Sequence, residues 1–194
     1  MSTDTDKSTR HYIETISTRP QRPIEIVDYD PSWPTAFTTI AERIKSALGP
    51  KALSVSHVGS TSIPGLAAKP VIDVDLVVAD PTAEDDYAPA LQATGFQFLF
   101  REPNWYQHRF FGLGEPYANI HVFGPGTVEL SRHRRFREWL LAHSEDRELY
   151  ERAKREAARV SREKGETVMG YNFRKEPVIE EIMVRAGIPL PGTD

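Results

Sequence analysis

An apolar run of strand length that contains two aspartates constrains this chain more than any other feature. In the sequence VIDVDLVV, the residues alternate between two sides, so that Asp73 and Asp75 share one side with Val71 and Val77. On a strand, the two side chains emerge roughly 7 Å apart, and like charges at that separation repel unless a cation or a proton lies between them. A hard divalent cation such as Mg²⁺ accepts carboxylate oxygens together with substrate phosphates. We therefore expect a magnesium site held by Asp73 and Asp75.

The loop before this strand supplies groups of the opposite character. Gly59 permits a positive φ and a close approach of the backbone, and Ser60 and Thr61 offer hydroxyl and N–H groups that can surround an anion. Together, the loop and the strand predict a phosphate site that faces a metal site. The alternative interpretation of the same residues is an ordinary turn followed by a strand whose aspartates face solvent.

The spacing of these motifs is similar to a known signature. Gly-Ser, a spacer and then Asp-x-Asp on a strand resembles the nucleotidyltransferase superfamily of the polymerase-β type. The longer string HVGSTSIPGLAAKPVIDVDLVV resembles the GrpB family, and the resemblance extends from Ile24 to Gly187. It implies an α+β fold of the nucleotidyltransferase type, with a mixed β-sheet flanked by helices and a helical C-terminal part. It implies a fold rather than an established activity.

The rest of the chain predicts one domain with two short tails. Residues 1–22 are polar and aperiodic, and Arg-Pro pairs stand near their end, at 19–20 and 22–23, so we expect a flexible N-terminal tail. A single domain is expected over residues 23–188, and a C-terminal tail over 189–194. Strands are predicted at 24–27, 53–58, 71–78, 96–100, 106–111 and 118–123. A helix is predicted from the cap Ser32, with Pro34 in its first turn, to Leu48, where Gly49-Pro50 stops it. Further helices are predicted at 84–94 and, in several segments, after residue 126.

Composition excludes several classes of protein. The 194 residues include no cysteine, which rules out disulfides, thiolate chemistry and zinc–thiolate sites. No apolar run approaches the roughly 20 residues that span a bilayer, and the first residues, MSTDTDKSTR, lack the apolar centre of a signal peptide. We therefore expect a cytoplasmic protein without a membrane partner.

Positive charge is concentrated in the C-terminal half of the chain. Between Val128 and Lys175 there are 13 Lys or Arg residues and 9 Asp or Glu residues, although the whole chain has a net charge of −4. This asymmetry is compatible with a contact to RNA, including transfer RNA. The alternative is a solvated helix face on which Arg and Glu pair at i,i+4 spacing.

Several basic and histidine side chains are candidates for the same site. Lys69 is placed to reach a phosphate, and Lys175 is placed to close over one. His108 and Arg109 lie on the predicted strand 106–111, where an arginine suits the recognition of phosphate. We expect Arg109 to share a side of the sheet with His121 on the neighbouring strand. His57 precedes the Gly-Ser loop and either binds a ligand or orients the loop.

The resemblance to the superfamily meets a difficulty on the strand ANIHVF. Transferases of the polymerase-β type take a third carboxylate from such a strand, but neither of its sides carries an acid here. His121 is the best substitute, as a metal ligand or as a base. The missing carboxylate weakens the expectation of two-metal chemistry.

These features lead to one hypothesis and two alternatives. The hypothesis is a nucleotidyltransferase-like enzyme that binds a nucleoside triphosphate with magnesium and transfers a nucleotidyl or related group to an acceptor, with Asp73, Asp75 and His121 as catalytic residues. The first alternative is a degenerate module that binds a nucleotide or RNA without turnover. The second is an acyl- or aminoacyl-handling enzyme whose aspartates recognise a cationic group.

Overall fold

The computed structural model describes residues 12–191, which divide into two compact units. The first unit contains residues 12–20, Ile40–Ser56 and Val74–Thr127. The second contains Gln21–Thr39, His57–Asp73 and residues 128–191. The division falls between Asp73 and Val74, so the two aspartates of the motif belong to different units.

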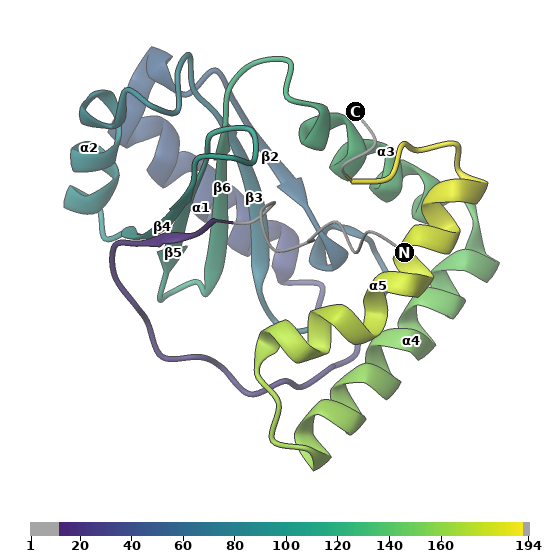
Figure 1. Cartoon of the computed structure of the whole chain (residues 1–194). Coiled ribbons are helices and arrows are strands. Elements are labelled where there is room, and N and C mark those ends of the chain that lie inside the picture. The colour runs from purple at the N-terminus through teal and green to yellow at the C-terminus, as the bar shows by residue number, and fades with distance from the viewer. Residues whose placement is uncertain (1–11, 192–194) are drawn as a thin grey trace, which may run out of the picture. The chain divides into compact units, whose positions relative to one another are not determined.

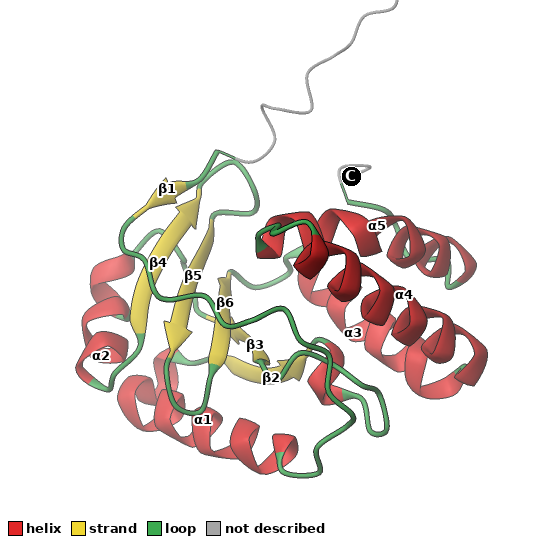
Figure 2. Cartoon of the chain, turned by 90° about the horizontal axis from the view of Figure 1, so that it is seen from below, coloured by secondary structure: helices red, strands yellow, loops and turns green. Residues whose placement is uncertain are grey.

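A six-stranded mixed sheet is the main feature of the first unit (Figure 2). Its strands are β1 (Glu14–Thr15), β2 (Ser54–Val58), β3 (Ile72–Val77), β4 (Gln97–Glu102), β5 (His108–Leu113) and β6 (Ala118–Phe123), in the spatial order β1-β4-β5-β6-β3-β2. β4 pairs antiparallel with β1 and β5, and β5 pairs antiparallel with β6. Because residues that face each other across an antiparallel pair share a side of the sheet, this register decides which polar side chains meet.

Two helices pack against the sheet through apolar residues. α1 (Trp33–Leu48) buries Ile40, Ile44 and Leu48 at helical spacing, and α2 (Ala88–Ala93) buries Leu91. Both helices lie on the same side of the sheet (Figure 2). Between the strands and α2, the rings of Phe98 and Phe111 stack with their centroids 4.4 Å apart. These contacts form the apolar core of the first unit.

The segment that the sequence placed in the N-terminal tail contributes the edge strand β1. Glu14 and Thr15 pair with β4, and the Glu14 carboxylate accepts a hydrogen bond from Arg101 Nη1 at 2.6 Å. The backbone N–H of Ile16 donates to the Leu99 carbonyl at 2.8 Å. No hydrophobic alternation marks so short a strand, so the sequence pattern alone does not reveal it. Residues 1–11 of the predicted tail lie outside the described residues.

Three helices make up most of the second unit: α3 (Val128–Ala142), α4 (Ser144–Glu163) and α5 (Val168–Arg185), shown in Figure 1. Short connections make consecutive helices neighbours. Their shared core contains the buried residues Ile63, Leu66, Leu140, Tyr150 and Ile182. At the C-terminus, the Arg132 guanidinium donates to the carbonyls of Pro189 and Leu190, at 2.8 and 2.9 Å. These bonds hold the first residues of the predicted C-terminal tail; residues 192–194 are not described.

Two predicted elements differ from the structure. The strand expected at 24–27 is a single antiparallel bridge between Val27 and Ala68. The helix expected at 84–94 is divided into a 3-10 turn, η4 (Glu84–Asp86), and α2. Tyr87 has a non-helical backbone, with φ −140° and ψ −33°, and Pro89 follows in the first turn of α2, where its missing N–H costs no hydrogen bond. The proline therefore fits a new helix start better than a continuous helix.

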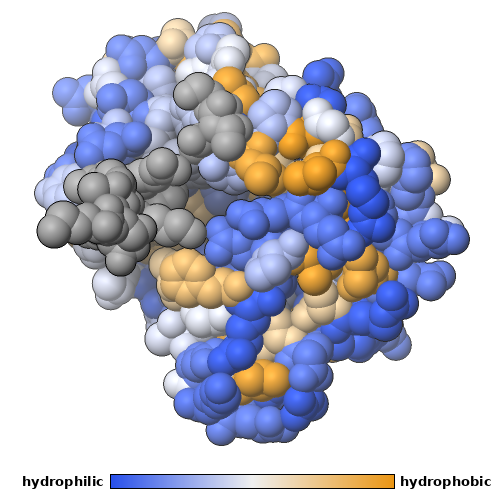
Figure 3. Space-filling view, turned by 45° about the vertical axis from the view of Figure 1, so that its right-hand side comes forward, coloured by the Kyte–Doolittle hydropathy of each residue, from blue (hydrophilic) through white to orange (hydrophobic). Residues whose placement is uncertain are grey.

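The surface around the C-terminal helices is mostly hydrophilic. Figure 3 brings this side of the molecule forward and shows separate hydrophobic patches on a largely hydrophilic surface. On α5, the exposed large hydrophobic side chains are Met169, Phe173 and Val184. Among residues 12–191, no helix has the length and apolar character that crossing a bilayer requires.

Candidate functional site

The Gly-Ser loop of the second unit folds tightly against Asp73. Gly59 has a φ of +68° and is followed by a 3-10 turn, η3 (Ser60–Ser62). A Cβ atom on Gly59 would lie 2.6 Å from Oδ2 of Asp73. Glycine is required here for two reasons, because the backbone is left-handed and because the carboxylate occupies the place of a side chain.

Most hydroxyl groups of the loop stabilise the loop itself. Thr61 Oγ1 donates to the Val71 carbonyl at 3.1 Å, and Ser62 Oγ donates to the Gly59 carbonyl at 2.6 Å. Thr61 and Ser62 are both buried. The half-buried Ser60 differs, because its hydroxyl lies 3.5 Å from the hydroxyl of Tyr150 on α4. Ser60 is therefore the loop residue whose side chain is best placed for a ligand.

His57 orients the loop through its side chain. Its ring stacks on Phe37, with centroids 4.8 Å apart, and its Nε2 atom lies 3.1 Å from Thr61 Oγ1. Because the single hydroxyl proton of Thr61 is donated to Val71, His57 Nε2 must be the donor in this contact. Burial lowers the pKa of His57 to about 4, although the charge of Asp73 opposes the shift. His57 is therefore neutral at physiological pH, with its ring proton on Nε2.

Three lysines gather around two tyrosines of the C-terminal helices, and we call Lys69, Lys154 and Lys175 the lysine cluster. The Nζ atoms of Lys69 and Lys175 lie 4.8 and 5.2 Å from the centroid of the Tyr171 ring. Lys154 Nζ lies 4.6 Å from the centroid of the Tyr150 ring and donates to the Ala67 carbonyl. The lysine cluster thus adjoins the Gly-Ser loop through Tyr150.

Acidic side chains compensate the charge of the lysine cluster only in part. Burial, together with the nearby charge of Lys175, lowers the pKa of Lys69 to about 8, against an opposing effect of Asp73. Burial and Lys175 also lower the pKa of Lys154 to about 7, against Glu151. Within residues 12–191, no carboxylate forms an ion pair with any of the three ammonium groups. An arrangement of this kind favours an anion, because an anion stabilises the charged form of the lysines against both burial and repulsion.

The carboxylates fit a resident metal poorly. Among the described residues, no three His, Asp or Glu side chains are grouped as a metal site requires. Asp73 is half-buried and lies close enough to Lys69 to raise the pKa of that amine. Asp75 is 3% exposed and belongs to the first unit. Since Mg²⁺ can be held by one or two carboxylates together with substrate phosphates, magnesium fits here only as a companion of a bound phosphate ligand.

His108 and His121 meet in the first unit, on one side of the sheet. His108 Nδ1 lies 2.7 Å from the Glu102 carboxylate, and His108 Nε2 lies 3.2 Å from His121 Nδ1. Burial lowers the pKa of His108 to about 4, although its hydrogen bond to Glu102 opposes the shift. We call Glu102, His108 and His121 the histidine chain.

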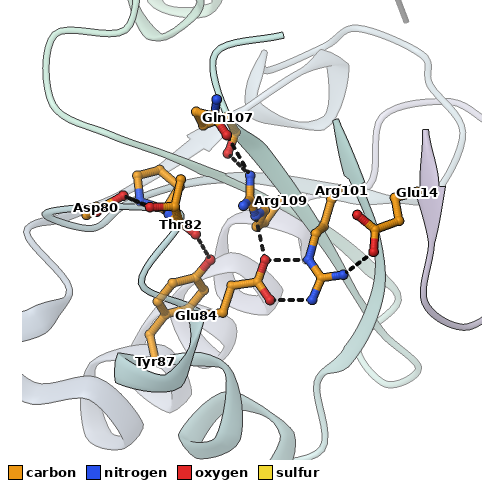
Figure 4. Close-up of polar contacts among 9 residues, drawn as sticks. Glu14, Asp80, Thr82, Glu84, Tyr87, Arg101, Gln107 and Arg109 are labelled. Carbon is orange, nitrogen blue, oxygen red and sulfur yellow. Dashed lines mark hydrogen bonds and ion pairs between the residues drawn. The ribbon is translucent and has the colours of Figure 1, made fainter. Parts of the chain in front are cut away.

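Arg109 lies on the other side of the same strands, in a network of charges shown in Figure 4. Its Nε atom donates to Glu84 Oε1 at 2.7 Å, and its Nη1 atom donates to the Gln107 carbonyl at 2.7 Å. Arg101 binds the same Glu84 carboxylate through two nitrogens and also binds Glu14. We call Glu14, Glu84, Arg101 and Arg109 the arginine network. The sequence suggested that Arg109 and His121 share a side of the sheet, but Arg109 pairs with Val122 across β5 and β6.

Arg155 and Arg159 of α4 are paired with acids of the second unit. Arg155 lies 2.6 Å from Asp28 and 3.0 Å from Glu151. Arg159 lies 2.6 Å from Glu156 and 2.7 Å from Glu163. This pairing matches the solvated helix face that was one of the two interpretations of the sequence. The prediction of an RNA contact gains no support from it.

The structure adds residues that the sequence did not indicate. Tyr150 and Lys154 stand four residues apart on α4, and the structure places both beside the Gly-Ser loop. Their i,i+4 spacing on one helix face is the only signal that the sequence offers. Glu84 and Glu102 were also not singled out, because each gains its role from a partner on another strand or turn.

Part of the chain is similar to part of an enzyme. A dephospho-CoA kinase from Mycolicibacterium paratuberculosis is 40% identical to it over 93 residues, which are 45% of this chain and 23% of the kinase. The similarity therefore covers a minor region of that protein.

Other proteins match nearly the whole chain. A UPF0157 protein from Halalkalibacterium halodurans is 47% identical over 163 residues, which cover 84% of this chain and 82% of that protein. A UPF0157 protein from Streptomyces coelicolor is 38% identical over 164 residues, with 84% of each chain covered. The crystal structure of the conserved protein GrpB from Enterococcus faecalis superposes with a TM-score of 0.69 at 24% identity, over 84% of this chain and 96% of that one. This likeness confirms the α+β fold with its C-terminal helices. Since the family model described as GrpB protein also matches residues 23–185, the chain belongs to the GrpB family.

Proposed function

We propose that the chain binds a nucleotide through its phosphate groups, at the lysine cluster of the second unit. The observation that carries this proposal is the convergence of Lys69, Lys154 and Lys175 on two tyrosine rings without a paired carboxylate among the described residues. Lys69 and Lys175 are half-buried and supply the direct contacts, together with the Ser60 hydroxyl. Lys154 is 1% exposed, so it adds positive potential to the site without contacting the ligand directly.

The physical reason is the free energy that the ligand recovers. Each lysine is held near others of the same sign in a partly desolvated place, which costs stability as long as no anion is bound. A phosphate that accepts hydrogen bonds from two ammonium groups gains roughly 1.5 to 3 kcal/mol for each charged bond. Binding of an anion is therefore favoured, because it offsets a repulsion among the lysines that already exists in the unliganded protein.

Two further observations support a nucleotide rather than a simple anion. The dephospho-CoA kinase that shares part of this sequence bears a name that refers to a nucleotide-containing substrate. The Gly-Ser loop and the Asp-x-Asp strand resemble the phosphate and metal elements of nucleotidyltransferases. The proposal extends to transfer of a nucleotidyl group, with magnesium accompanying the phosphates.

Calorimetric titration tests the binding directly. ATP is titrated into the protein with and without Mg²⁺, and adenosine and tripolyphosphate are titrated separately. We expect ATP and tripolyphosphate to bind and adenosine to bind far more weakly, because the contacts are made to phosphate. Binding of adenosine as tight as that of ATP would contradict the proposal.

A pair of lysine variants locates the site. Lys175→Met removes one charge of the lysine cluster, whereas Lys164→Met removes an exposed charge after the end of α4. We expect Lys175→Met to weaken ATP binding roughly 10- to 100-fold, and Lys164→Met to leave it unchanged. Equal affinities of the two variants would place the nucleotide elsewhere.

Turnover is a separate measurement. Pyrophosphate release from ATP is followed with a panel of hydroxyl and amine acceptors, in the wild type and in Asp73→Asn and Asp75→Asn variants. Release that both substitutions abolish would support a nucleotidyltransferase. Tight binding without any release would instead favour the degenerate nucleotide-binding module.

A further inference from the structure

One arginine of α3 differs from its neighbours on the same helix. Arg132 donates to two carbonyls of the C-terminal segment, and Arg135 donates to the Gly187 carbonyl at 2.8 Å. The half-buried Arg137 forms no hydrogen bond or ion pair in the part of the chain that the structure describes, and its Nε atom is buried without a partner. A buried donor without an acceptor reduces stability. Arg137 therefore does not serve the fold as the other two arginines do.

The packing of α3 places Arg137 beside the Gly-Ser loop. Leu140, three residues later and on the same face of the helix, shares a core with Ile63, which follows the loop. The charge of Arg137 also acts on His57, which precedes the loop. It adds to the effect of burial in lowering the pKa of His57, whereas Asp73 opposes the shift. All of these residues belong to the second unit.

The lysine cluster borders a different part of the same loop. Phe136, the neighbour of Arg137, packs edge-on against Tyr150, with ring centroids 5.6 Å apart. Tyr150 also contacts Lys154 through its ring and approaches Ser60 through its hydroxyl. The repulsion from Lys175 acts on the other two lysines, whereas that from Arg137 acts on His57. The loop therefore has two cationic neighbours, the lysine cluster and Arg137.

We infer that Arg137 is a second anion subsite, which binds one phosphate group of a ligand whose other phosphate is held by the lysine cluster. The inference rests on the proposed function and narrows it, because the ligand must carry at least two linked phosphates, as nucleoside di- and triphosphates do. A guanidinium presents a planar fork of donors that fits phosphate oxygens in pairs. The Nη atoms make this contact, since they are not enclosed as the Nε atom is.

The balance of charge favours a chain of phosphates over a single anionic group. The cations around the loop are the three lysines and Arg137, and the carboxylates that oppose them are those of Asp73 and Glu151. A single phosphate or carboxylate at the lysine cluster leaves Arg137 without an acceptor. A chain of phosphates can offset both cationic groups at once, which is the reason for assigning them to one ligand.

Calorimetry with ATP and AMP tests the second subsite. Arg137→Met removes its guanidinium, and Arg134→Met removes an exposed one from the same helix as a control. We expect Arg137→Met to weaken ATP binding roughly 10- to 100-fold and to leave AMP binding unchanged, because the lysine cluster holds the single phosphate of AMP. Arg134→Met should change neither affinity. Equal ATP affinities of the two variants, or equal losses for ATP and AMP in Arg137→Met, would overturn the inference.

The variant Lys175→Met separates this inference from the proposed function. We expect it to weaken both ATP and AMP, since it alters the lysine cluster. If Lys175→Met weakens both nucleotides and Arg137→Met weakens neither, the inference fails and the proposed function stands. If Lys175→Met weakens neither, or if the wild type does not bind ATP, the proposed function fails and the assignment of a second subsite fails with it.

Arginine NMR keeps the inference testable if Arg137→Met does not fold. The Nε–H signals of the ¹⁵N-labelled wild-type protein are recorded, and the signal of Arg137 is assigned by its loss in the conservative variant Arg137→Lys. We expect tripolyphosphate to shift this signal and AMP to leave it in place. The signal of the exposed Arg134 should move with neither ligand. A signal of Arg137 that is unchanged at saturation with tripolyphosphate would contradict its contact with phosphate.

Discussion

The lysine cluster and the arginine network are both groups of half-buried or buried cations, but their charges are balanced differently. In the arginine network, Glu84 accepts hydrogen bonds from both Arg101 and Arg109, and Glu14 accepts another from Arg101. These bonds outweigh the effect of burial and lower the pKa of Glu84. In the lysine cluster, it is the pKa values of Lys69 and Lys154 that are lowered, by burial and by repulsion.

The contrast indicates which cations serve the fold and which serve a ligand. A guanidinium whose N–H groups are already bonded to carboxylates contributes to stability and has few donors available for a phosphate. Ammonium groups that repel one another reduce stability and gain from an added anion. The arginine network should therefore stabilise the fold and leave binding alone, whereas the lysine cluster should favour binding and reduce the stability of the unliganded protein.

The largest expected effect is on stability, from the variant Glu84→Gln. It removes the negative charge shared by two guanidinium groups and replaces one acceptor oxygen by an NH2 donor. The side chain of Arg109 is only 7% exposed. We expect the free energy of unfolding to fall by about 3 kcal/mol, measured by urea denaturation, while the affinity for ATP stays unchanged. Glu148→Gln is the control, because that side chain is 71% exposed and lies 4.0 Å from Arg152. A loss no greater than that of the control would show that the network is not structural.

The second effect is a dependence of stability on pH that originates at Lys154. Its pKa is about 7 in the folded protein and near 10.5 when unfolded, so the unfolded chain binds more protons between these values. Stability therefore rises as the pH increases through this range. We expect Lys154→Met to reduce the rise between pH 7 and 9 by about 2 kcal/mol.

The exposed residue Lys45 provides the control for this slope. Lys45→Met should leave the dependence of the unfolding free energy on pH as it is in the wild type, since an exposed lysine has similar surroundings in both states. A wild-type stability that does not rise from pH 7 to 9 would mean that Lys154 is not held as a strained ammonium group.

The third effect is on binding. Lys69 has a pKa of about 8 and loses its proton as the pH rises from 7 to 9. We expect the affinity for ATP to fall roughly tenfold over this range, since one charged hydrogen bond is weakened. Calorimetry at several pH values measures the change, and Lys69→Met should show a weaker and flatter profile. An affinity that stays constant in the wild type would remove Lys69 from the phosphate contact.

The smallest effect is expected from the exposed ion pairs of α4. Arg159 binds Glu156 and Glu163, but its side chain is 52% exposed. We expect Arg159→Gln to change the free energy of unfolding by less than about 0.5 kcal/mol and to leave ATP binding unaltered. A clear loss of affinity would show that the basic face of α4 takes part in binding, as the prediction of an RNA contact requires.

The sequence predicted the elements whose signals are local. The Gly-Ser loop, β3 with its two aspartates and the bounds of β6 follow from glycine, alternation and turn residues. The burial of Lys154 could not be predicted from local signals. Its neighbours in the sequence are Arg and Glu, which are typical of a solvent-exposed helix, and only the packing of α4 buries it. A pattern of charges does not reveal which member of the pattern faces inward.

The pairing of side chains across strands could not be predicted from the sequence for a different reason. The turn between β4 and β5 depends on left-handed Tyr106 and Gln107, and neither residue type signals such a turn. A shift of one residue in register moves every side chain to the other side of a sheet. That is why Arg109 was placed beside His121, whereas the structure gives this position to His108.

The most direct test of the account is the titration of the lysines themselves. With ¹³C-labelled lysine, NMR follows the ε-carbon of Lys69 from pH 6 to 11, first without a ligand and then at saturation with ATP. We expect a pKa of about 8 without the ligand, and a marked rise toward the ordinary value of about 10.4 when phosphate offsets the repulsion from Lys175. A pKa of Lys69 that is unchanged by saturating ATP would contradict the claim that the lysine cluster holds the phosphates.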